Sequence, residues 1–227
     1  MTVKENLARI QQEIDIVCQR VGRESTSVKI IAVTKYVSDE RAQEVLELGI
    51  NHIGENRADE GVRKWQVLNG KGTWHFIGTL QSRKVKDIVD RFEYIHSLDR
   101  LSLAKEIQKR ATKSVKCFIQ VNVSGETSKQ GISPSDLIQF VNDLKQFPFI
   151  EVVGLMTMAP NEDDPEETRP NFKKLKELQI EVQNLKLPYA PCNELSMGMS
   201  NDYHIAIEEG ATFVRLGTSL VGNMNKV

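Results

Sequence analysis

The stretch VKIIAVTKYVSDE, Val28 to Glu40, joins an apolar run to an abrupt polar end. Residues 28–36 have the composition of a buried strand, and residues 39–48 have the spacing of an amphipathic helix. A buried strand that is followed within a few residues by a helix is the repeating unit of parallel α/β folds. The strand also contains Lys35 at its end, a residue type that a protein core does not favour, so this position needs a chemical explanation.

The alternation of strand and helix patterns continues through the rest of the chain. We expect further strands at residues 52–54, 73–79, 93–98, 115–123, 150–158, 193–198 and 212–218, each but the last followed by a helical pattern. These strands predict an α/β fold, a single (β/α)8 TIM barrel over residues 1–227, with an extra N-terminal helix at residues 2–21. An open doubly wound sheet is the alternative, but no GxGxxG motif follows the first strand.

The composition argues against several classes of protein. The 227 residues have a formal net charge of -1 and a sequence pI of about 6.5, which provide no overall field for nucleic acid or an anionic membrane. No apolar run approaches the ~20 residues of a membrane helix, and the charged N-terminus is unlike a secretory signal. Three scattered cysteines without a CxxC motif fit a reducing compartment. We therefore expect a cytoplasmic, monomeric protein that binds neither nucleic acid nor membrane.

Functional residues of a TIM barrel lie at the carboxyl ends of its strands, and Lys35 is the first candidate. A single lysine at a strand end more often extends to water, which is the alternative explanation. In a partly dry barrel mouth, burial would lower the pKa of its amine from ~10.4. A neutral amine condenses with an aldehyde to form a Schiff base.

The ends of the last two strands predict a phosphate site. Ser200 has the position of a helix N-cap, which leaves backbone N–H groups of the next turn free to bind an anion. Gly217 allows the backbone to approach a ligand closely, and Thr218 offers an N–H group and a hydroxyl. Each residue alone could belong to an ordinary cap or turn. Their joint occurrence favours a phosphate site, because such a site after strands seven and eight recurs in barrels.

Arg215 lies inside the last predicted strand, in the sequence FVRLG. An outward arginine that pairs with a helix carboxylate is the simpler alternative. An inward guanidinium could face a carboxylate or the nitrogen of a heteroaromatic ring. A reactive lysine, a phosphate site and an arginine together suit pyridoxal 5'-phosphate (PLP), with the ring nitrogen facing Arg215.

Ordered motifs cover nearly the whole chain: IAVTKYV, HIGENR, WHFIGTLQSRKVK, SLD, QVNVSGETSKQGI, GLMTMAP and LSMGMSNDYHIAIEEGATFVRLGTSLVG. In these motifs the sequence closely resembles the pyridoxal phosphate homeostasis proteins, also called the alanine racemase N-terminal-like family. The resemblance implies a PLP-binding TIM barrel with a Schiff base at Lys35. It also implies phosphate contacts from Ser200, Gly217 and Thr218, and a position for Arg215 near the pyridine nitrogen.

The resemblance further implies that Asn56, in the GEN motif, and Met199 line the same pocket. One departure from the family pattern is Arg83, where the family often has asparagine. This departure concerns the start of the local helix and lies outside the predicted cofactor residues.

The predicted site favours a carrier of PLP over an enzyme. A permanent cation at Arg215 disfavours protonation of the ring nitrogen and weakens the ring as an electron sink. The related racemases use a tyrosine from an additional β domain, whereas this chain ends at Val227, soon after the last predicted strand. The resemblance implies the same function: PLP and amino-acid levels are affected without an established reaction. We expect apo-PLP enzymes as acceptors, and the alternative is a weak one-base racemase or lyase.

A metal-dependent barrel hydrolase is a further alternative. His52, His75 and His96 lie in three neighbouring predicted strands, and imidazoles from adjacent strands can share a metal ion. Histidines that are satisfied within the core explain the pattern better, because His52 and His75 come early in their strands. In addition, no HxH or HExxH pair occurs in the sequence. We therefore expect no metal site.

Overall fold

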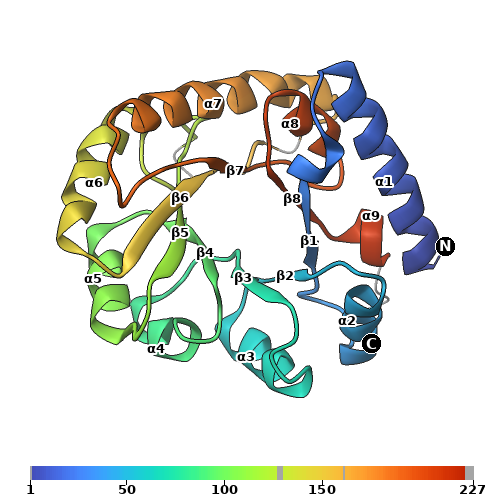
Figure 1. Ribbon diagram of the computed structural model, residues 1–227, viewed down its shortest axis with the longest axis horizontal. Helices are drawn as coiled ribbons and strands as arrows, with labels where there is room; N and C mark the ends of the chain where they lie inside the picture. The colour runs from blue at the N-terminus through green and yellow to red at the C-terminus, as the bar shows by residue number, and fades with distance from the viewer. Residues whose placement is uncertain (1, 127–129, 161, 223–227) are drawn as a thin grey trace.

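The computed structural model describes residues 2–126, 130–160 and 162–222. Within these residues, eight parallel strands hydrogen-bond in sequence order, and β8 pairs with β1 to close a barrel (Figure 1). The strands are β1 (Lys29–Val33), β2 (His52–Glu55), β3 (Thr73–Phe76), β4 (Tyr94–Leu98), β5 (Val115–Gln120), β6 (Ile150–Met156), β7 (Glu194–Ser196) and β8 (Phe213–Leu216). The predicted (β/α)8 TIM barrel is confirmed, and the assignment of residues 1–227 to one domain stays a prediction.

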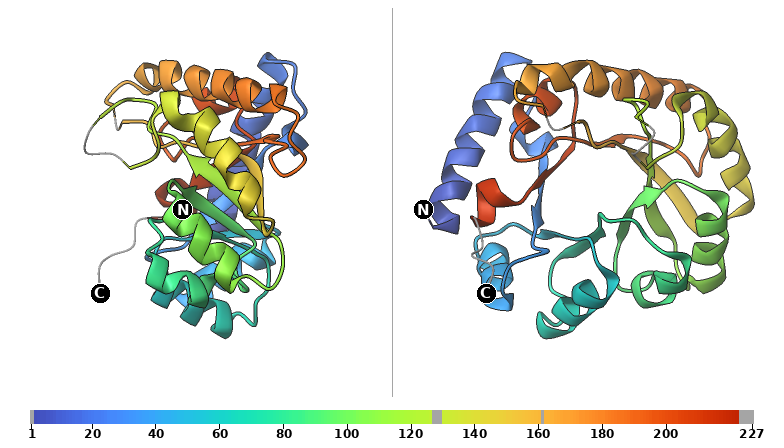
Figure 2. Two further views of the ribbon diagram at one scale, coloured as in Figure 1. Left: turned by 90° about the vertical axis from the view of Figure 1, so that its left-hand side faces the viewer. Right: turned by 180° about the vertical axis from the view of Figure 1, so that it is seen from behind.

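Helices surround the barrel on its outer side, as Figures 1 and 2 show. They are α1 (Val3–Arg20), α2 (Asp39–Glu47), α3 (Ala58–Val67), α4 (Val85–Ile88), α5 (Leu101–Arg110), α6 (Leu137–Asp143), α7 (Arg169–Asn184), α8 (Tyr203–Glu208) and α9 (Thr218–Val221). In the described residues, three 3-10 segments lead into helices: η2 (Ser82–Lys84) into α4, η3 (Pro134–Asp136) into α6 and η5 (Pro165–Thr168) into α7. In the described part of the chain, no helix combines the length and the apolar character needed to cross a membrane.

The extra N-terminal helix α1 is present and is attached to the barrel. It begins with a capping box in which Thr2 Oγ1 accepts from the Glu5 N–H and the Glu5 carboxylate accepts from the Thr2 N–H. Ile10 lies on its buried face. The buried Asn6 donates from Nδ2 to the Leu220 carbonyl at 2.9 Å, so α1 packs beside α9 and α8 (Figure 1).

Several strands end earlier than the sequence pattern predicts. β1 ends at Val33, and the chain then turns, with the Val37 N–H donating to the Thr34 carbonyl at 3.1 Å. Similarly, β5 ends at Gln120 and β8 ends at Leu216. The residues that were predicted to continue these strands instead form the loops around the carboxyl end of the barrel.

Apolar side chains pack on both sides of the sheet. The larger group lies between the strands and the surrounding helices. A smaller group packs inside the barrel and consists of Ile31, Phe118, Val153, Met156 and Phe213. This double covering explains why several strands are apolar without alternation.

Candidate functional site

A cavity of about 640 Å³ lies at the carboxyl ends of the strands. All the residues predicted for the site line it: Lys35, Asn56, Met199, Ser200, Arg215, Gly217 and Thr218. Ile77 and Gly78 after β3, Gln120 at the end of β5, and Met158 after β6 also contribute to its wall. The structure therefore brings the predicted residues together, while their contacts with a cofactor stay a prediction.

Lys35 lies two residues beyond the end of β1. Its side chain is exposed, and its Nζ lies 5.2 Å from the centre of the Tyr36 ring. The expectation of a partly buried lysine at the strand end is therefore wrong, because Thr34 takes the buried position where the chain turns. The Lys35 amine lies at the rim of the cavity and is open to solvent.

A buried ion pair anchors the backbone beside this lysine. Lys64 Nζ, on α3, lies 2.7 Å from Glu55 Oε1 and donates to the Thr34 carbonyl at 2.5 Å. Thr34 Oγ1 donates to the same Glu55 oxygen at 2.6 Å. The Lys64 and Glu55 side chains are 3% and 0% exposed. Because Thr34 precedes Lys35 and Glu55 precedes Asn56, this cluster fixes the backbone at two positions of the cavity wall.

Sequence reasoning missed this ion pair. The available signal was Glu55, a carboxylate at the end of an apolar strand, because a buried charge requires a partner. The helical pattern around Lys64 does not distinguish it from solvent-facing lysines.

Asn56 leaves a hydrogen-bond acceptor available at the cavity. Its Oδ1 is buried and accepts no hydrogen bond from the described residues. Native proteins rarely leave such an atom unsatisfied, so a ligand donor is one way to complete it. Gly78 packs directly against this position, since a Cβ there would collide with the Asn56 carbonyl.

Arg215 faces the barrel interior rather than the surrounding helices, and it is 5% exposed. Its Nη1 donates to Ser196 Oγ at 2.7 Å, and its Nη2 donates to the Thr157 carbonyl at 2.9 Å. Burial lowers the pKa of Arg215 to about 10, and nearby Asp202 opposes the shift. The guanidinium is therefore charged at neutral pH and presents a fixed cation to the cavity.

Ser200 is not the N-cap of the following helix, which corrects the prediction. α8 begins at Tyr203 and has Asp202 at its N-cap position. Asp202 Oδ1 accepts from the Met199 N–H at 2.6 Å and closes the turn that places Ser200 at the cavity. Burial raises the pKa of Asp202, although the bond from Met199 N–H opposes this effect. Serine, asparagine and aspartate all cap helices well, so the sequence MSND alone could not identify the cap.

Ser219, which sequence reasoning missed, completes a cluster of hydroxyl groups. Its N–H and its hydroxyl lie 3.3 Å and 2.9 Å from Ser200 Oγ. Thr218 precedes it and is exposed. Gly217 lines the cavity, and a Cβ at this position would meet Val33 at an ordinary contact distance of 3.7 Å. This edge of the cavity therefore offers hydroxyl and N–H donors to an anion.

The three strand histidines bond to one another. His75 Nε2 lies 2.9 Å from His52 Nδ1, and His75 Nδ1 lies 2.9 Å from His96 Nε2. Within the described ranges, no group of three or more histidine, cysteine, aspartate or glutamate side chains could hold a metal ion. These contacts agree with histidines that are satisfied in the core.

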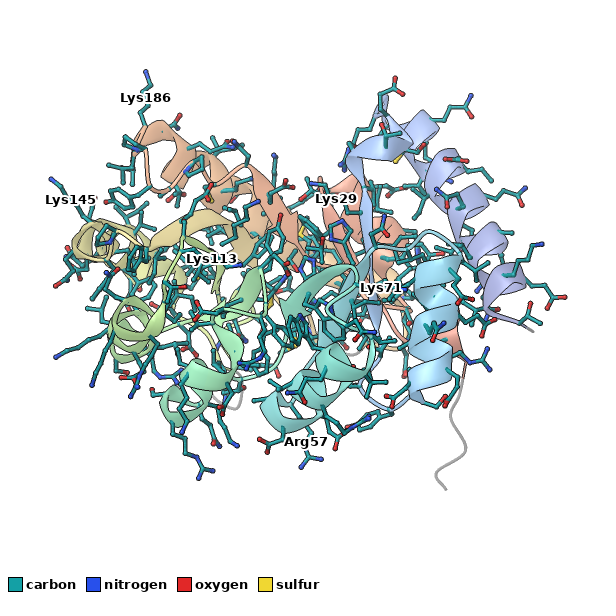
Figure 3. All side chains as sticks on the ribbon, turned by 60° about the horizontal axis from the view of Figure 1, so that its bottom comes forward. Lys29, Arg57, Lys71, Lys113, Lys145 and Lys186 are labelled. Atoms are coloured by element: carbon teal, nitrogen blue, oxygen red, sulfur yellow. The ribbon has the colours of Figure 1, made fainter. Side chains whose placement is uncertain are left out.

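Arg83 lies outside the main cavity. Its Nε donates to Gln81 Oε1 at 2.9 Å, and it lines a second cavity of about 260 Å³ with Arg57 and Lys84. Lys84 Nζ pairs with Asp59 Oδ1 at 2.5 Å. Figure 3 shows Arg57 extending from the edge of the molecule. The departure from the family pattern therefore leaves the wall of the main cavity unchanged.

Comparison with known proteins defines the class of this barrel. The family model described as "Alanine racemase, N-terminal domain" matches residues 6–225, so the chain belongs to that family. The chain is also 43% identical to the pyridoxal phosphate homeostasis protein of Aquifex aeolicus (strain VF5), over 98% of both proteins. It is 32% identical to the pyridoxal phosphate homeostasis protein of Escherichia coli (strain K12), over 97% of this chain and 96% of the relative. Within the broader class, it therefore belongs to the pyridoxal phosphate homeostasis protein family.

Solved structures agree with this assignment. PipY of Synechococcus elongatus PCC7942 covers 97% of this chain and all of its own, with 34% identity and a TM-score of 0.86 for the structure without PLP. The structure of PipY with PLP bound gives 32% identity and a TM-score of 0.84. The alanine racemase of Clostridium difficile 630 shares the fold at 18% identity and a TM-score of 0.74, over 99% of this chain and 57% of the racemase.

The buried ion pair predicts a large effect on stability. Lys64→Met leaves the buried Glu55 carboxylate without its cation, and we expect the free energy of unfolding to fall by about 3–5 kcal/mol. Arg110→Ala is the control, because it breaks an ion pair with Glu106 at 2.8 Å on a solvent-facing helix surface. That control should cost less than about 1 kcal/mol. Urea denaturation measures both, and equal losses would contradict the structural role of Lys64.

Proposed function

We propose that this protein binds PLP reversibly in the 640 Å³ cavity and acts as a carrier or buffer of this reactive aldehyde, thereby influencing amino-acid levels. One observation is central: an exposed amine at Lys35, a group of hydroxyls near Ser200 and a buried cation at Arg215 all meet at one cavity. The PLP-bound structure of PipY and the names of the relatives support the proposal.

The groups around the cavity fit the chemical parts of PLP. The hydroxyl groups of Ser200 and Thr218, which line the cavity, suit its phosphate. Ser219 donates from both its N–H and its hydroxyl to Ser200 Oγ, so the Ser200 hydroxyl proton can be donated to the phosphate. Arg215 suits the ring nitrogen, because a guanidinium donates hydrogen bonds and cannot accept them. The unsatisfied Asn56 Oδ1 offers an acceptor on the wall of the same cavity.

Lys35 would hold the cofactor as a Schiff base, the chemistry that the bound aldehyde supplies. Lys35 would contribute its amine nitrogen to this bond, and the two amine protons would leave with the aldehyde oxygen as water. Because Lys35 is exposed, water and other amines can reach this bond and reverse it. An accessible, reversible bond suits release better than long retention.

The charged Arg215 favours carriage over catalysis. A cation beside the ring nitrogen disfavours a second positive charge there, which weakens the ring as an acceptor of electrons. The chain has four tyrosines, and in the described structure none of them lines the cavity as a second acid or base. Delivery to apo-enzymes, the cytoplasmic location and the monomeric state stay predictions.

The role of Lys35 predicts a visible colour. We expect the purified protein to be yellow when loaded with PLP and Lys35→Ala to lose the colour, because the variant has no amine at the cavity rim. Lys84→Ala is the control and should stay yellow, since Lys84 lies in the second cavity. Borohydride reduction followed by peptide mapping locates the attachment, and a pyridoxyl group on another lysine would refute the assignment.

The hydroxyl cluster predicts a dependence on the phosphate. Ser200→Ala and Thr218→Val each remove a hydrogen bond to a charged group, so PLP binding should weaken by about 1.5–3 kcal/mol while Schiff-base formation remains possible. Pyridoxal, which lacks the phosphate, should bind the unmodified protein poorly. Titration by absorbance measures these affinities, and equal affinity for pyridoxal and PLP would eliminate this phosphate site.

The carrier function predicts transfer without turnover. We expect PLP-loaded protein to restore the activity of an apo-PLP enzyme, and we expect no multiple-turnover exchange of amino-acid Cα hydrogen with solvent deuterium. The reason is the weak electron sink beside Arg215 together with the accessible bond at Lys35. Sustained exchange that is lost in Lys35→Ala would instead establish a one-base enzyme.

A further inference from the structure

Buried polar groups form a continuous chain through the interior of the barrel. It runs from His52 on β2 to His75 on β3 and His96 on β4, with 2.9 Å between successive ring nitrogens. His96 Nδ1 then lies 2.9 Å from Ser196 Oγ on β7, which accepts from Arg215 Nη1 at 2.7 Å. Five side chains from five strands thus connect one end of the barrel with the cavity.

The surroundings isolate this chain from water along most of its length. His75, His96 and Ser196 are 0% exposed. The His75 ring stacks on the Tyr94 ring with 4.4 Å between the ring centres, and the His96 ring stacks on the Phe118 ring with 4.3 Å between the ring centres. Burial lowers the pKa of His75 and of His96 well below the usual value, so both rings are neutral. A neutral imidazole has one N–H donor and one acceptor, so each ring can donate in one direction along the chain.

Arg215 determines the direction of donation. A guanidinium has donors and no acceptor, so Ser196 Oγ must accept from it. The Ser196 proton then requires an acceptor, and among the described residues the hydroxyl has one other hydrogen-bonded neighbour, His96 Nδ1. Ser196 therefore donates to His96, whose own proton lies on Nε2 and is donated to His75 Nδ1. By the same step, His75 donates from Nε2 to His52 Nδ1.

The far end of the chain is the open end. His52 is partly exposed and begins β2, near the Lys29–Glu194 ion pair, whose charged atoms are 2.9 Å apart. Figure 3 labels Lys29, at the start of β1, well away from Arg57, which follows β2 on the side of the cavity. The chain of donated hydrogen bonds thus starts at the buried Arg215 and ends at His52, at the opposite mouth of the barrel.

We propose that Ser196 is a positioning residue for Arg215 and that the ordered histidine chain fixes the Ser196 hydroxyl, with His52, His75 and His96 all protonated at Nε2. Because His96 Nδ1 accepts a hydrogen bond from the Ser196 hydroxyl, the serine lone pairs are directed to the guanidinium, which holds Arg215 in one orientation at the cavity. Such chains are cooperative, since each donated bond strengthens the next. The inference deepens the proposed function, because Arg215 is the group assigned to the PLP ring nitrogen, but its proton order does not require PLP.

Histidine tautomers provide the direct test in protein without added PLP. The sequence has four histidines, so side-chain ¹⁵N spectra are simple, and His204 on α8 is an internal reference outside the chain. At neutral pH we expect His52, His75 and His96 each to show a protonated Nε2 and an unprotonated Nδ1. A proton at Nδ1 of any of the three would overturn the proposed order, and this measurement needs no variant.

Ser196→Ala tests the effect on Arg215, and Ser97→Ala is a matched control. Ser97 is 1% exposed, and its hydroxyl has no hydrogen-bond partner within the described residues. We expect the Arg215 Nη groups to rotate slowly in the unmodified protein and in Ser97→Ala, and roughly 3- to 10-fold faster in Ser196→Ala, as loss of one hydrogen bond allows. Equal rates in the two variants would overturn the positioning role.

The loaded protein adds a second readout. With ¹⁵N-labelled PLP, the ring-nitrogen chemical shift should change in Ser196→Ala and stay unchanged in Ser97→Ala. An unchanged shift in both variants would also contradict the positioning role. If the protein did not bind PLP at all, the proposed function would fail, whereas the histidine tautomers and the Arg215 rotation would still decide this inference.

Discussion

A buried guanidinium is the constraint on which the barrel interior and the cavity both depend. Arg215 cannot lose its charge at neutral pH, so its removal from water must be offset by nearby acceptors. Ser196 Oγ and the Thr157 carbonyl accept its hydrogen bonds, and Asp202 stabilises its charge. These groups come from β7, from the end of β6 and from the turn before α8, so contacts with one cation fix the relative positions of three parts of the chain.

The same constraint explains why an aromatic and aliphatic barrel interior contains histidines. The Ser196 hydroxyl can accept a hydrogen bond from Arg215 and also donate one, because His96 Nδ1 is adjacent. The Nε2–H group of His96 then needs an acceptor, which is His75 Nδ1. The Nε2–H group of His75 needs one in turn, which is Nδ1 of the partly exposed His52. Each buried polar group is satisfied by the next, so the chain ends only where solvent is near.

The fold could be predicted from sequence because alternating strand and helix patterns are local signals. The residues of the cavity could be predicted because strand ends converge in a barrel, and family motifs identified them. The histidine chain could not, because contact between His75, His96 and Ser196 depends on strand register and tilt. The burial of Lys64 could likewise not be predicted from the sequence, since its partners Glu55 and Thr34 lie on other elements.

The proposed carrier function would make two demands on the structure, specific binding and release, and different parts of the cavity suit each of them. Specific binding needs rigid groups, and those at the Arg215 end are buried and held by several hydrogen bonds. Release would need the proposed bond to be accessible, and Lys35 lies on an exposed turn outside the sheet ladder. The Lys64–Glu55 pair fixes the backbone just before that turn, so the amine keeps its place at the rim while remaining open to water. An enzyme that holds its cofactor through many turnovers benefits from enclosing this bond, whereas a carrier benefits from exposing it.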